Sequence, residues 1–279
     1  MCIKNEQNIL QEFSSLEDPR QDGKKLHMLS EILLVTITSV ICGAESWRDI
    51  VNFGKSKLMY LRKYLPYKHG IASKDTLQRM FALLNPEEFK ACFLDWVQSI
   101  CQLSSEIIPI DGKTLRRSFD RAKDKPAIQM VSAFARGAGL VLAQQKVDDD
   151  SNEITAIPKL LQLFELKGHI ITIDAMGCQQ EIAREIVDKG GDYVLSLKKN
   201  QLDLYEDAKL LIEDAIANDS PNIKIDKYQT TNGEHGRIEV RKYYATSDIG
   251  WLKKRHSFKN MKSIAMVESH RTVNKHTSI

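Results

Sequence analysis

Two aspartates in this sequence each follow directly on a short run of β-branched and apolar residues. Asp111 comes after residues 107–110, and Asp174 comes after residues 170–173. Short apolar runs of this kind, bounded by turn-forming residues, are typical of buried strands. Each carboxylate is therefore predicted to stand at the carboxyl end of a strand, which is the edge where open α/β sheets bind their ligands.

The chemistry open to these carboxylates depends on a cation. Two carboxylates held close together repel, and each raises the pKa of the other unless a cation lies between them. Mg²⁺ and Mn²⁺ prefer carboxylate oxygen and keep bound waters for a substrate phosphate. A pair of such ions about 4 Å apart activates a water or a 3′-hydroxyl and stabilises the leaving oxygen of a phosphodiester. Asp111 and Asp174 are therefore predicted metal ligands, and a plain Asp-Gly turn is the alternative for Asp111.

The triplet Gly112-Lys113-Thr114 invites comparison with a phosphate-binding loop that cradles a nucleotide. That motif needs a first glycine five residues before the glycine of Gly-Lys, and this position holds Ile107. The loop cannot form, and a nucleotide-binding loop is excluded at this point of the chain.

The elements that must position the aspartates come after a helical region. Ser46, Ser73 and Asn85 each stand where a side-chain oxygen can cap a helix, and Asn85 is followed by Pro86 and Glu88 in a capping-box pattern. Helices are predicted near residues 30–42, 47–64 and 74–84, and from residue 86 onward. They form a predicted helical domain over residues 1–105.

From residue 107 the pattern changes to strands that alternate with helices. Strands are predicted over residues 107–110, 128–135, 140–147, 170–173 and 193–197, and amphipathic helices over residues 153–164 and 179–188. Gly137 and Gly139 supply the turn of a hairpin between the second and third strands. The two helices have the length that joins parallel strands. The prediction is an α/β fold with a mixed sheet, in which the first, fourth and fifth strands run parallel and both aspartates lie at one end.

The last part of the chain is predicted to be an appended β region. A helix over residues 202–217 is followed by strands over residues 223–229, 237–245 and 263–268. The second domain is thus predicted to cover residues 106–279, with an inserted helix and β region from about residue 200.

Charge and composition favour a polyanionic partner. The net charge is only +3, but residues 53–70 contain five basic and no acidic residues, and further basic clusters follow Asp111 and occupy residues 253–262. The five cysteines show neither Cys-x-x-Cys pairs nor zinc-finger spacing. The most apolar stretch is too short to span a bilayer, and the N-terminus lacks the form of a signal peptide. We therefore expect a cytoplasmic protein without a membrane partner.

Four sequence blocks in register resemble one family. The blocks are IDGKTLRRS, ITIDAMGCQ, GGDYVLSLKKNQ and HGRIEVR. In this order they closely resemble the H-repeat-associated transposases of bacterial insertion sequences, over about residues 13–271. The resemblance implies an enzyme in which residues 1–105 are a helical DNA-binding region. A ribonuclease-H-like domain follows, which cleaves and transfers DNA strands with Mg²⁺ or Mn²⁺ in a two-metal site. It also implies the double-stranded terminal repeats of an insertion sequence as the partner.

The same resemblance makes Asp111 and Asp174 the first two acids of an Asp-Asp-Glu triad. The third acid of the family is a glutamate in a helix after the β insertion, within a motif like His-Trp-x-Ile-Glu, and this sequence contains no Trp-x-Ile-Glu. Glu239 is a fallback third carboxylate and Glu234 a weaker one, and the alternative for both is a solvated hairpin face. The final catalytic helix is therefore expected to be missing, and the chain is expected to be truncated and inactive by itself.

DNA contacts are predicted for basic residues near the aspartates and on the β region. These residues are Lys113, Arg116, Arg117, Lys198, Lys199, Arg237 and Arg241. Because transposition joins two ends, the resemblance also implies a homodimer. The alternative functions are a DNA-binding remnant or competitor without catalysis, and a nuclease unrelated to transposition.

Overall fold

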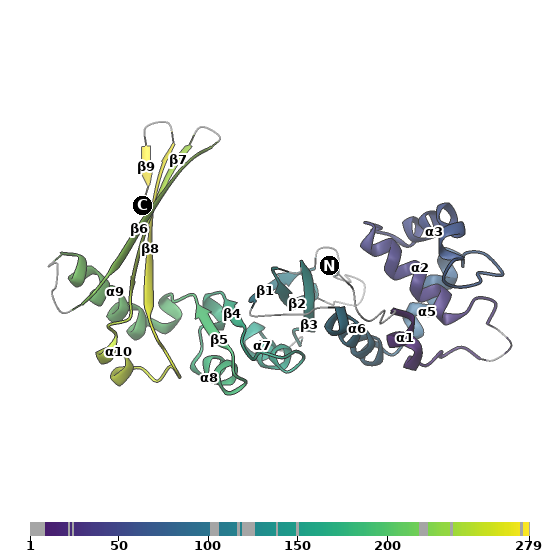
Figure 1. Ribbon diagram of the computed structural model, residues 1–279, viewed down its shortest axis with the longest axis horizontal. Coiled ribbons are helices and arrows are strands. Elements are labelled where there is room, and N and C mark those ends of the chain that lie inside the picture. Colours follow the sequence, from purple (N-terminus) through teal and green to yellow (C-terminus); the bar gives the residue numbers. More distant parts are fainter. Residues whose placement is uncertain are drawn as a thin grey trace. The chain divides into compact units, whose positions relative to one another are not determined.

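The chain forms two compact units, Met1–Gln102 and Leu103–Ile279 (Figure 1). The computed structural model describes residues 9–21, 23, 25–100, 106–115, 118, 126–137, 139–148, 151–217, 223–234, 237–273 and 276–278. Among them, no helix is long and apolar enough to cross a membrane.

The N-terminal unit is helical, as predicted. Its helices are α1 (Ile9–Glu12), α2 (Leu29–Ile41), α3 (Trp47–Ser56), α4 (Leu58–Leu61), α5 (Lys74–Leu83) and α6 (Pro86–Ile100), with a 3₁₀ turn η1 (Phe13–Ser15). The predicted caps are present. The Ser46 and Ser73 hydroxyls each accept a backbone N–H at 3.2 Å, and the Asn85 side chain accepts the N–H of Glu87 at 3.0 Å.

The helix predicted over residues 47–64 is two helices, which corrects the prediction. Lys57 has φ −106° and ψ 13°, outside helical values, and separates α3 from α4. Apolar residues continue at helical spacing through this point, so periodicity did not reveal the break. The two helices pack into different apolar clusters. Ile50 of α3 belongs to one cluster, and Leu61 of α4 belongs to another.

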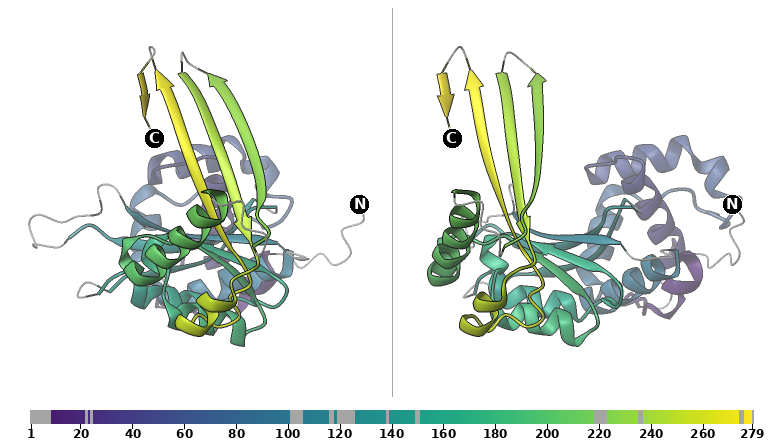
Figure 2. Two further views of the ribbon diagram at one scale, coloured as in Figure 1. Left: turned by 90° about the vertical axis from the view of Figure 1, so that its left-hand side faces the viewer. Right: turned by 60° about the vertical axis from the view of Figure 1, so that its left-hand side comes forward.

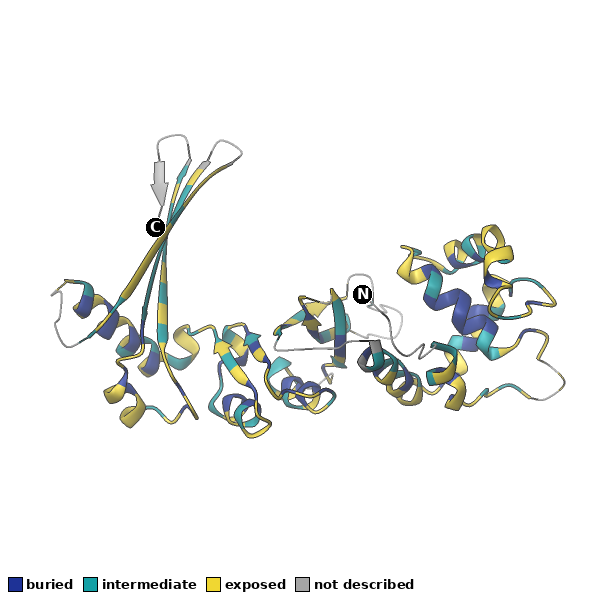
Figure 3. Cartoon of the chain, viewed as in Figure 1, coloured by how far each residue is buried: buried dark blue, intermediate teal, exposed yellow. Residues whose placement is uncertain are grey.

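Helix α2 lies at the centre of the N-terminal unit, and most of it is buried (Figure 3). Ile32, Leu33 and Ile37 contribute to its largest apolar cluster, and each fully buried side chain of this size stabilises the fold by about 1.5–3 kcal/mol. Glu31 is also buried, but its carboxylate accepts the backbone N–H of Tyr67 at 2.5 Å. This hydrogen bond ties α2 to the loop before α5.

The C-terminal unit contains a mixed five-stranded sheet. Its strands are β1 (Ile107–Thr114), β2 (Gln129–Ala135), β3 (Leu140–Lys146), β4 (Ile170–Ile173) and β5 (Asp192–Leu195), in the order β3-β2-β1-β4-β5. β2 pairs antiparallel with β1 and β3, whereas β4 pairs parallel with β1 and β5. The crossovers are α7 (Glu153–Leu161) and α8 (Gln180–Asp188). The predicted mixed sheet is confirmed.

Strand β1 is longer than predicted, because it continues to Thr114 instead of ending at residue 110. The pairing with β4 ends at Ile110, and residues 111–114 pair with β2 alone. Asp111 therefore lies inside β1, at the point where its parallel pairing stops. The apolar pattern marked only the part of the strand that contains buried residues, because Ile108 and Ile110 are buried and none of residues 111–114 is.

A second, four-stranded antiparallel sheet follows. Its elements are α9 (Leu202–Ala217), β6 (Asp226–Glu234), β7 (Arg237–Thr246), α10 (Gly250–Arg255), β8 (Ile264–Val273) and β9 (His276–Ser278), with strand order β6-β7-β8-β9. Figure 2 shows β6, β7 and β8 as long neighbouring strands, and α9 contacts β7 and β8. The predicted hairpin is confirmed. α10 and β9 were not predicted, because their short and largely polar sequences carry no clear period.

Buried apolar side chains on one face hold the five-stranded sheet in place. Ile108 and Ile171 on the central strands are fully buried, as are Leu160 of α7 and Ile186 of α8. A separate apolar cluster joins α8 and β5 to α9 and α10. The central strands are therefore fixed by packing, and their ends have defined positions.

Candidate active site

The parallel pairing of β1 and β4 brings Asp111 and Asp174 to the same edge of the sheet. Ile110 is the register partner of Ile173, so each aspartate is the next residue beyond a matched pair. Neighbouring strands lie about 4.8 Å apart, and both aspartate side chains are exposed. The two carboxylates lie at one end of the parallel pairing, as the strand order predicted, but Asp111 lies inside β1 and not at the end of its strand.

Asp174 begins the 3₁₀ turn η3 (Ala175–Gly177). Its Oδ1 accepts the backbone N–H of Met176 at 3.2 Å, which orients the carboxylate. A Cβ added to Gly177 would lie 3.1 Å from Ile157 of α7 and closer still to Ile173. Glycine at this position therefore lets η3 pack closely on α7 and on the end of β4.

Asp111 is paired only loosely. Lys113, on the same side of the strand two residues later, has its Nζ 3.5 Å from Asp111 Oδ2, and the two side chains are 77% and 61% exposed. Exposed ion pairs of this kind contribute little to stability, about 0–1 kcal/mol. The Asp111 carboxylate is therefore available to another cation.

A third carboxylate, that of Glu153, lies at this edge and was not predicted from the sequence. Glu153 is the first residue of α7. A Cβ added to Gly112 would lie 2.7 Å from Glu153 Oε2 and closer still to Oε1, so the glutamate side chain occupies the space beside Gly112. Burial raises the pKa of Glu153, and the charges of Asp174 and Asp111 raise it further. The available signal was an acidic residue at the start of the helix that crosses from β3 to β4.

Two predicted lysines lie in a turn that is attached to η3. Asn200 Nδ2 donates to the carbonyl of Ala175 at 2.6 Å, and Gln201 Nε2 donates to the carbonyl of Cys178 at 3.1 Å. Lys198 and Lys199, both exposed, precede these residues in the turn after β5. The structure therefore brings this basic pair to the segment that follows Asp174.

The donor set at this edge fits a hard divalent cation. Carboxylate oxygens from Asp111, Asp174 and Glu153 are the ligands that Mg²⁺ and Mn²⁺ prefer, and the exposed edge leaves room for waters. The space beside Gly112, which any Cβ would fill, is taken by the glutamate. Across the described ranges, no three His, Cys, Asp or Glu side chains already stand close enough together to hold an ion. The three carboxylates are of the type that binds such a metal and lie at the same edge, but they are not close enough together to hold an ion.

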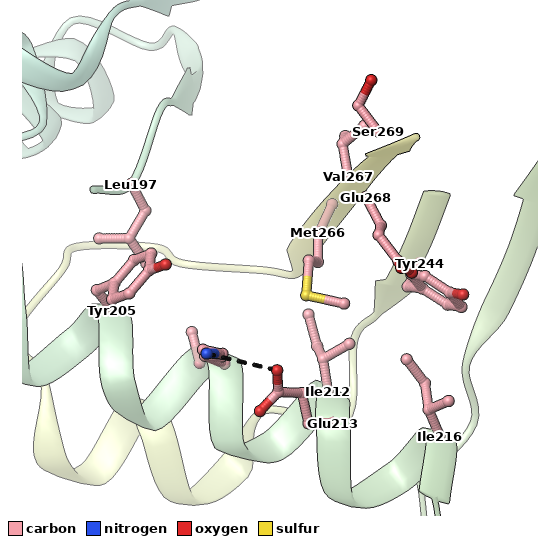
Figure 4. Close-up of a pocket in the computed structure, with 13 residues that line it drawn as sticks. Leu197, Tyr205, Ile212, Glu213, Ile216, Tyr244, Met266, Val267, Glu268 and Ser269 are labelled. Carbon is pink, nitrogen blue, oxygen red and sulfur yellow. Dashed lines mark ion pairs between the residues drawn. The ribbon is translucent and has the colours of Figure 1, made fainter. Parts of the chain in front are cut away.

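A groove elsewhere in the unit is apolar. Between α9 and strands β7 and β8 lies a pocket of about 730 Å³, lined by Tyr205 and Ile212 of α9 and by Tyr244 and Met266 of the sheet (Figure 4). Neither of the two aspartates lines it, and its charged lining residues are Glu268 and the Lys209–Glu213 ion pair of α9, at 3.6 Å. This groove is not the place for metal chemistry.

Comparison with protein families decides the identity. The family "Transposase DDE domain" matches residues 102–275, and the family "DDE_Tnp_1-associated" matches residues 10–97. The chain belongs to the DDE transposase family. The resemblance stated from the sequence is thereby confirmed.

Three relatives are similar in sequence to most of this chain. "Putative transposase YncI" of Escherichia coli (strain K12) is 45% identical over 236 residues, which are 84% of this chain and 94% of that protein. "H repeat-associated putative transposase YhhI" of the same strain is 42% identical over 235 residues, 84% of this chain and 61% of that protein. "Uncharacterized protein in dhlA 3'region" of Xanthobacter autotrophicus is 40% identical over 266 residues, 94% of this chain and 88% of that protein.

Glu239, the fallback third carboxylate, lies in the second sheet. It stands on β7, where its Oε1 accepts from Arg241 Nη2 at 2.9 Å and from Ser269 Oγ at 3.1 Å. The structure does not bring this carboxylate to Asp111 and Asp174.

The other predicted residues of the transposase fall in three groups. Arg241 is exposed on β7 and bound to Glu239. Arg116 and Arg117 lie outside the described residues. Glu234 and Arg237 pair through their backbones at the end of the β6–β7 hairpin, and their side chains lie outside the described part.

Proposed function

We propose that this transposase cleaves and transfers DNA strands at the ends of an insertion sequence, with Asp111 and Asp174 as ligands of Mg²⁺ or Mn²⁺. The observation that carries the proposal is the parallel register of β1 and β4, which sets both carboxylates at one open edge of the sheet. Membership of the DDE transposase family supports the same reaction class.

The proposed roles of Asp111 and Asp174 follow from the elements that hold them. When bound, the divalent ions supply Lewis-acid activation of a water or 3′-hydroxyl and charge stabilisation at the leaving oxygen. Asp111 would hold the ions from β1, and Asp174 would do so from the end of β4, where the Met176 N–H orients it. The open edge would let a duplex approach, which an enclosed pocket would not.

Basic side chains around this edge are proposed to bind the DNA backbone. Lys113 stands beside Asp111, and Lys198 and Lys199 stand in the turn attached to η3. Each lysine that neutralises a phosphate releases a counterion, so the affinity falls with salt. The set is completed by Arg116, Arg117, Arg237 and Arg241. The terminal repeats of the element are the proposed duplex, and a homodimer is the proposed assembly because transfer joins two ends.

Cleavage of DNA that carries the element's terminal repeats tests the proposal. The sequence alone led us to expect an inactive chain. If the two aspartates hold the metal as proposed, the chain instead nicks this DNA with Mn²⁺, and Asp111→Asn and Asp174→Asn abolish nicking. Asp203→Asn, an exposed acid in the first turn of α9, is the matched control and should retain activity. Cleavage that persists in both site variants would refute the assignment of these aspartates.

A second candidate function is DNA binding without catalysis. It is favoured by the absence, among the described residues, of three metal-binding side chains that already form a site. This function predicts salt-sensitive binding to the repeats that survives Asp111→Asn, with no cleavage in Mn²⁺. Loss of binding in Asp111→Asn would remove its basis.

A further inference from the structure

We propose that Glu153, on α7, is a further carboxylate ligand of the metal centre formed by Asp111 and Asp174. The inference rests on the proposed function, because it assigns a further ligand to the same site. It adds to the two aspartates a glutamate from the crossover between β3 and β4, distinct from the glutamate of the family's Asp-Asp-Glu triad.

The first support is the close approach of Glu153 to the end of the parallel pairing. Its carboxylate fills the space that a side chain at position 112 would occupy, and a Cβ there would lie 2.7 Å from Oε2. Gly112 is the residue directly after Asp111 in β1. The glutamate therefore reaches the sheet edge only because its neighbour on β1 has no side chain.

The second support is that α7 is fixed relative to both aspartates. Leu160 and Leu161 bury its apolar face, and the helix contacts β2, β3 and η3. Ile157, one turn after Glu153, lies 3.1 Å from the position of a Cβ on Gly177, at the end of the turn that Asp174 begins. The same helix thus packs on the turn after Asp174 and presents its first residue beside Asp111.

The third support is that Glu153 has no compensating partner in the described structure. Within the described ranges, no side chain donates a hydrogen bond to its carboxylate, and no lysine or arginine forms an ion pair with it. The positive end of the α7 dipole offsets part of one negative charge. Three carboxylates at one edge remain under-neutralised, and a divalent cation supplies the missing charge.

The structural alternative is that Glu153 is only a favourable acid in the first turn of a helix. The chain offers a matched control for that role. Glu181 stands in the first turn of α8, a helix of 9 residues like α7, and it is exposed. If Glu153 acts only through its helix, substitutions at the two positions should have the same effect on metal binding.

Titration of the full chain with Mn²⁺, followed by the electron paramagnetic resonance signal of free Mn²⁺, tests the proposal without measuring activity. We expect Glu153→Gln to weaken Mn²⁺ binding by about tenfold or more, and Glu181→Gln to bind like the wild type. Gly112→Ala should also weaken binding, because its methyl group displaces the glutamate while both aspartates remain.

Thermal unfolding with and without Mn²⁺ separates a folding defect from a lost ligand. Mn²⁺ should raise the melting temperature of the wild type and of Glu181→Gln, and should raise that of Glu153→Gln much less. Wild-type affinity in Glu153→Gln, together with lost affinity in Asp111→Asn, would overturn the inference and leave the proposed function standing. Failure of the wild type to bind Mn²⁺ would overturn both.

Discussion

Among the single residues of the chain, Asp18 shows how a neighbouring side chain sets the charge of a carboxylate. Its side chain is 18% exposed and accepts from Arg20 Nε at 2.9 Å and from Nη2 at 2.7 Å. This two-point pairing holds the pKa of Asp18 below its usual value of 3.8.

The lowered pKa of Asp18 predicts a pH-dependent contribution to stability. The charged form is favoured in the folded state, so the stabilisation is present above pH 3.8 and is lost as the pH falls through the folded pKa. We predict that Asp18→Asn lowers the free energy of unfolding at neutral pH by on the order of 1 kcal/mol, and that the variant and wild type converge in acid. Urea unfolding at both pH values measures this. Asp95→Asn, an exposed acid of α6, should have little effect at either pH. A loss in Asp18→Asn that is the same at both pH values would contradict the prediction.

The candidate site was predictable at two of its residues and not at the third. Asp111 and Asp174 follow apolar strands, and sequence order alone indicated that these strands pair in parallel. Glu153 carries no such signal, because an acid at the first position of a helix is common for reasons of the helix dipole. Its importance depends on the distance across the sheet edge to Gly112, which only the folded chain defines.

At the scale of elements, a buried polar cluster joins α9 to α10. Asp207 accepts from His256 Nε2 at 2.7 Å and from Arg255 Nε at 3.0 Å, with Asp207 and His256 largely buried. We predict that Asp207→Ala lowers the free energy of unfolding by about 1–3 kcal/mol, because His256 loses its buried partner. Glu213→Ala, which breaks an exposed pair on the same helix, should cost less than about 0.5 kcal/mol. Equal losses in urea unfolding would show that the cluster does not hold α10 in place.

Helices and strands were predicted best where the apolar residues follow a single regular spacing. The parallel strands and α8 carry clear apolar patterns, and their positions agree with the structure. The break at Lys57 was missed because the apolar spacing continues across it. The extension of β1 was missed because none of residues 111–114 is buried, so they carry no apolar pattern. The apolar pattern of a sequence indicates which residues are buried. It does not detect a change of backbone direction or a strand segment whose residues are not buried.

For the whole molecule, the two compact units have separate cores. The N-terminal unit has its own apolar clusters around α2, and the C-terminal unit has another around α9 and α10. A unit with its own core can fold alone, so we predict that residues 1–102 and 103–279, produced separately, each unfold cooperatively. Circular dichroism during urea titration measures this. A fragment without a cooperative transition would show that its core is completed by the other unit.

The whole-molecule charge is too small to account for the proposed DNA binding, so local position must decide which lysines contribute. The net charge is +3, whereas the affinity of a protein for DNA follows the number of phosphates that it neutralises. We predict that replacing both Lys198 and Lys199 by alanine reduces the slope of log affinity against log salt by about 0.9 for each lysine that contacts a phosphate. Lys253 and Lys254, equally exposed on α10, are the matched control, and their double alanine variant should keep the wild-type slope. If the slope falls only in the α10 variant, the duplex lies against α10 and not against the edge that carries Asp174.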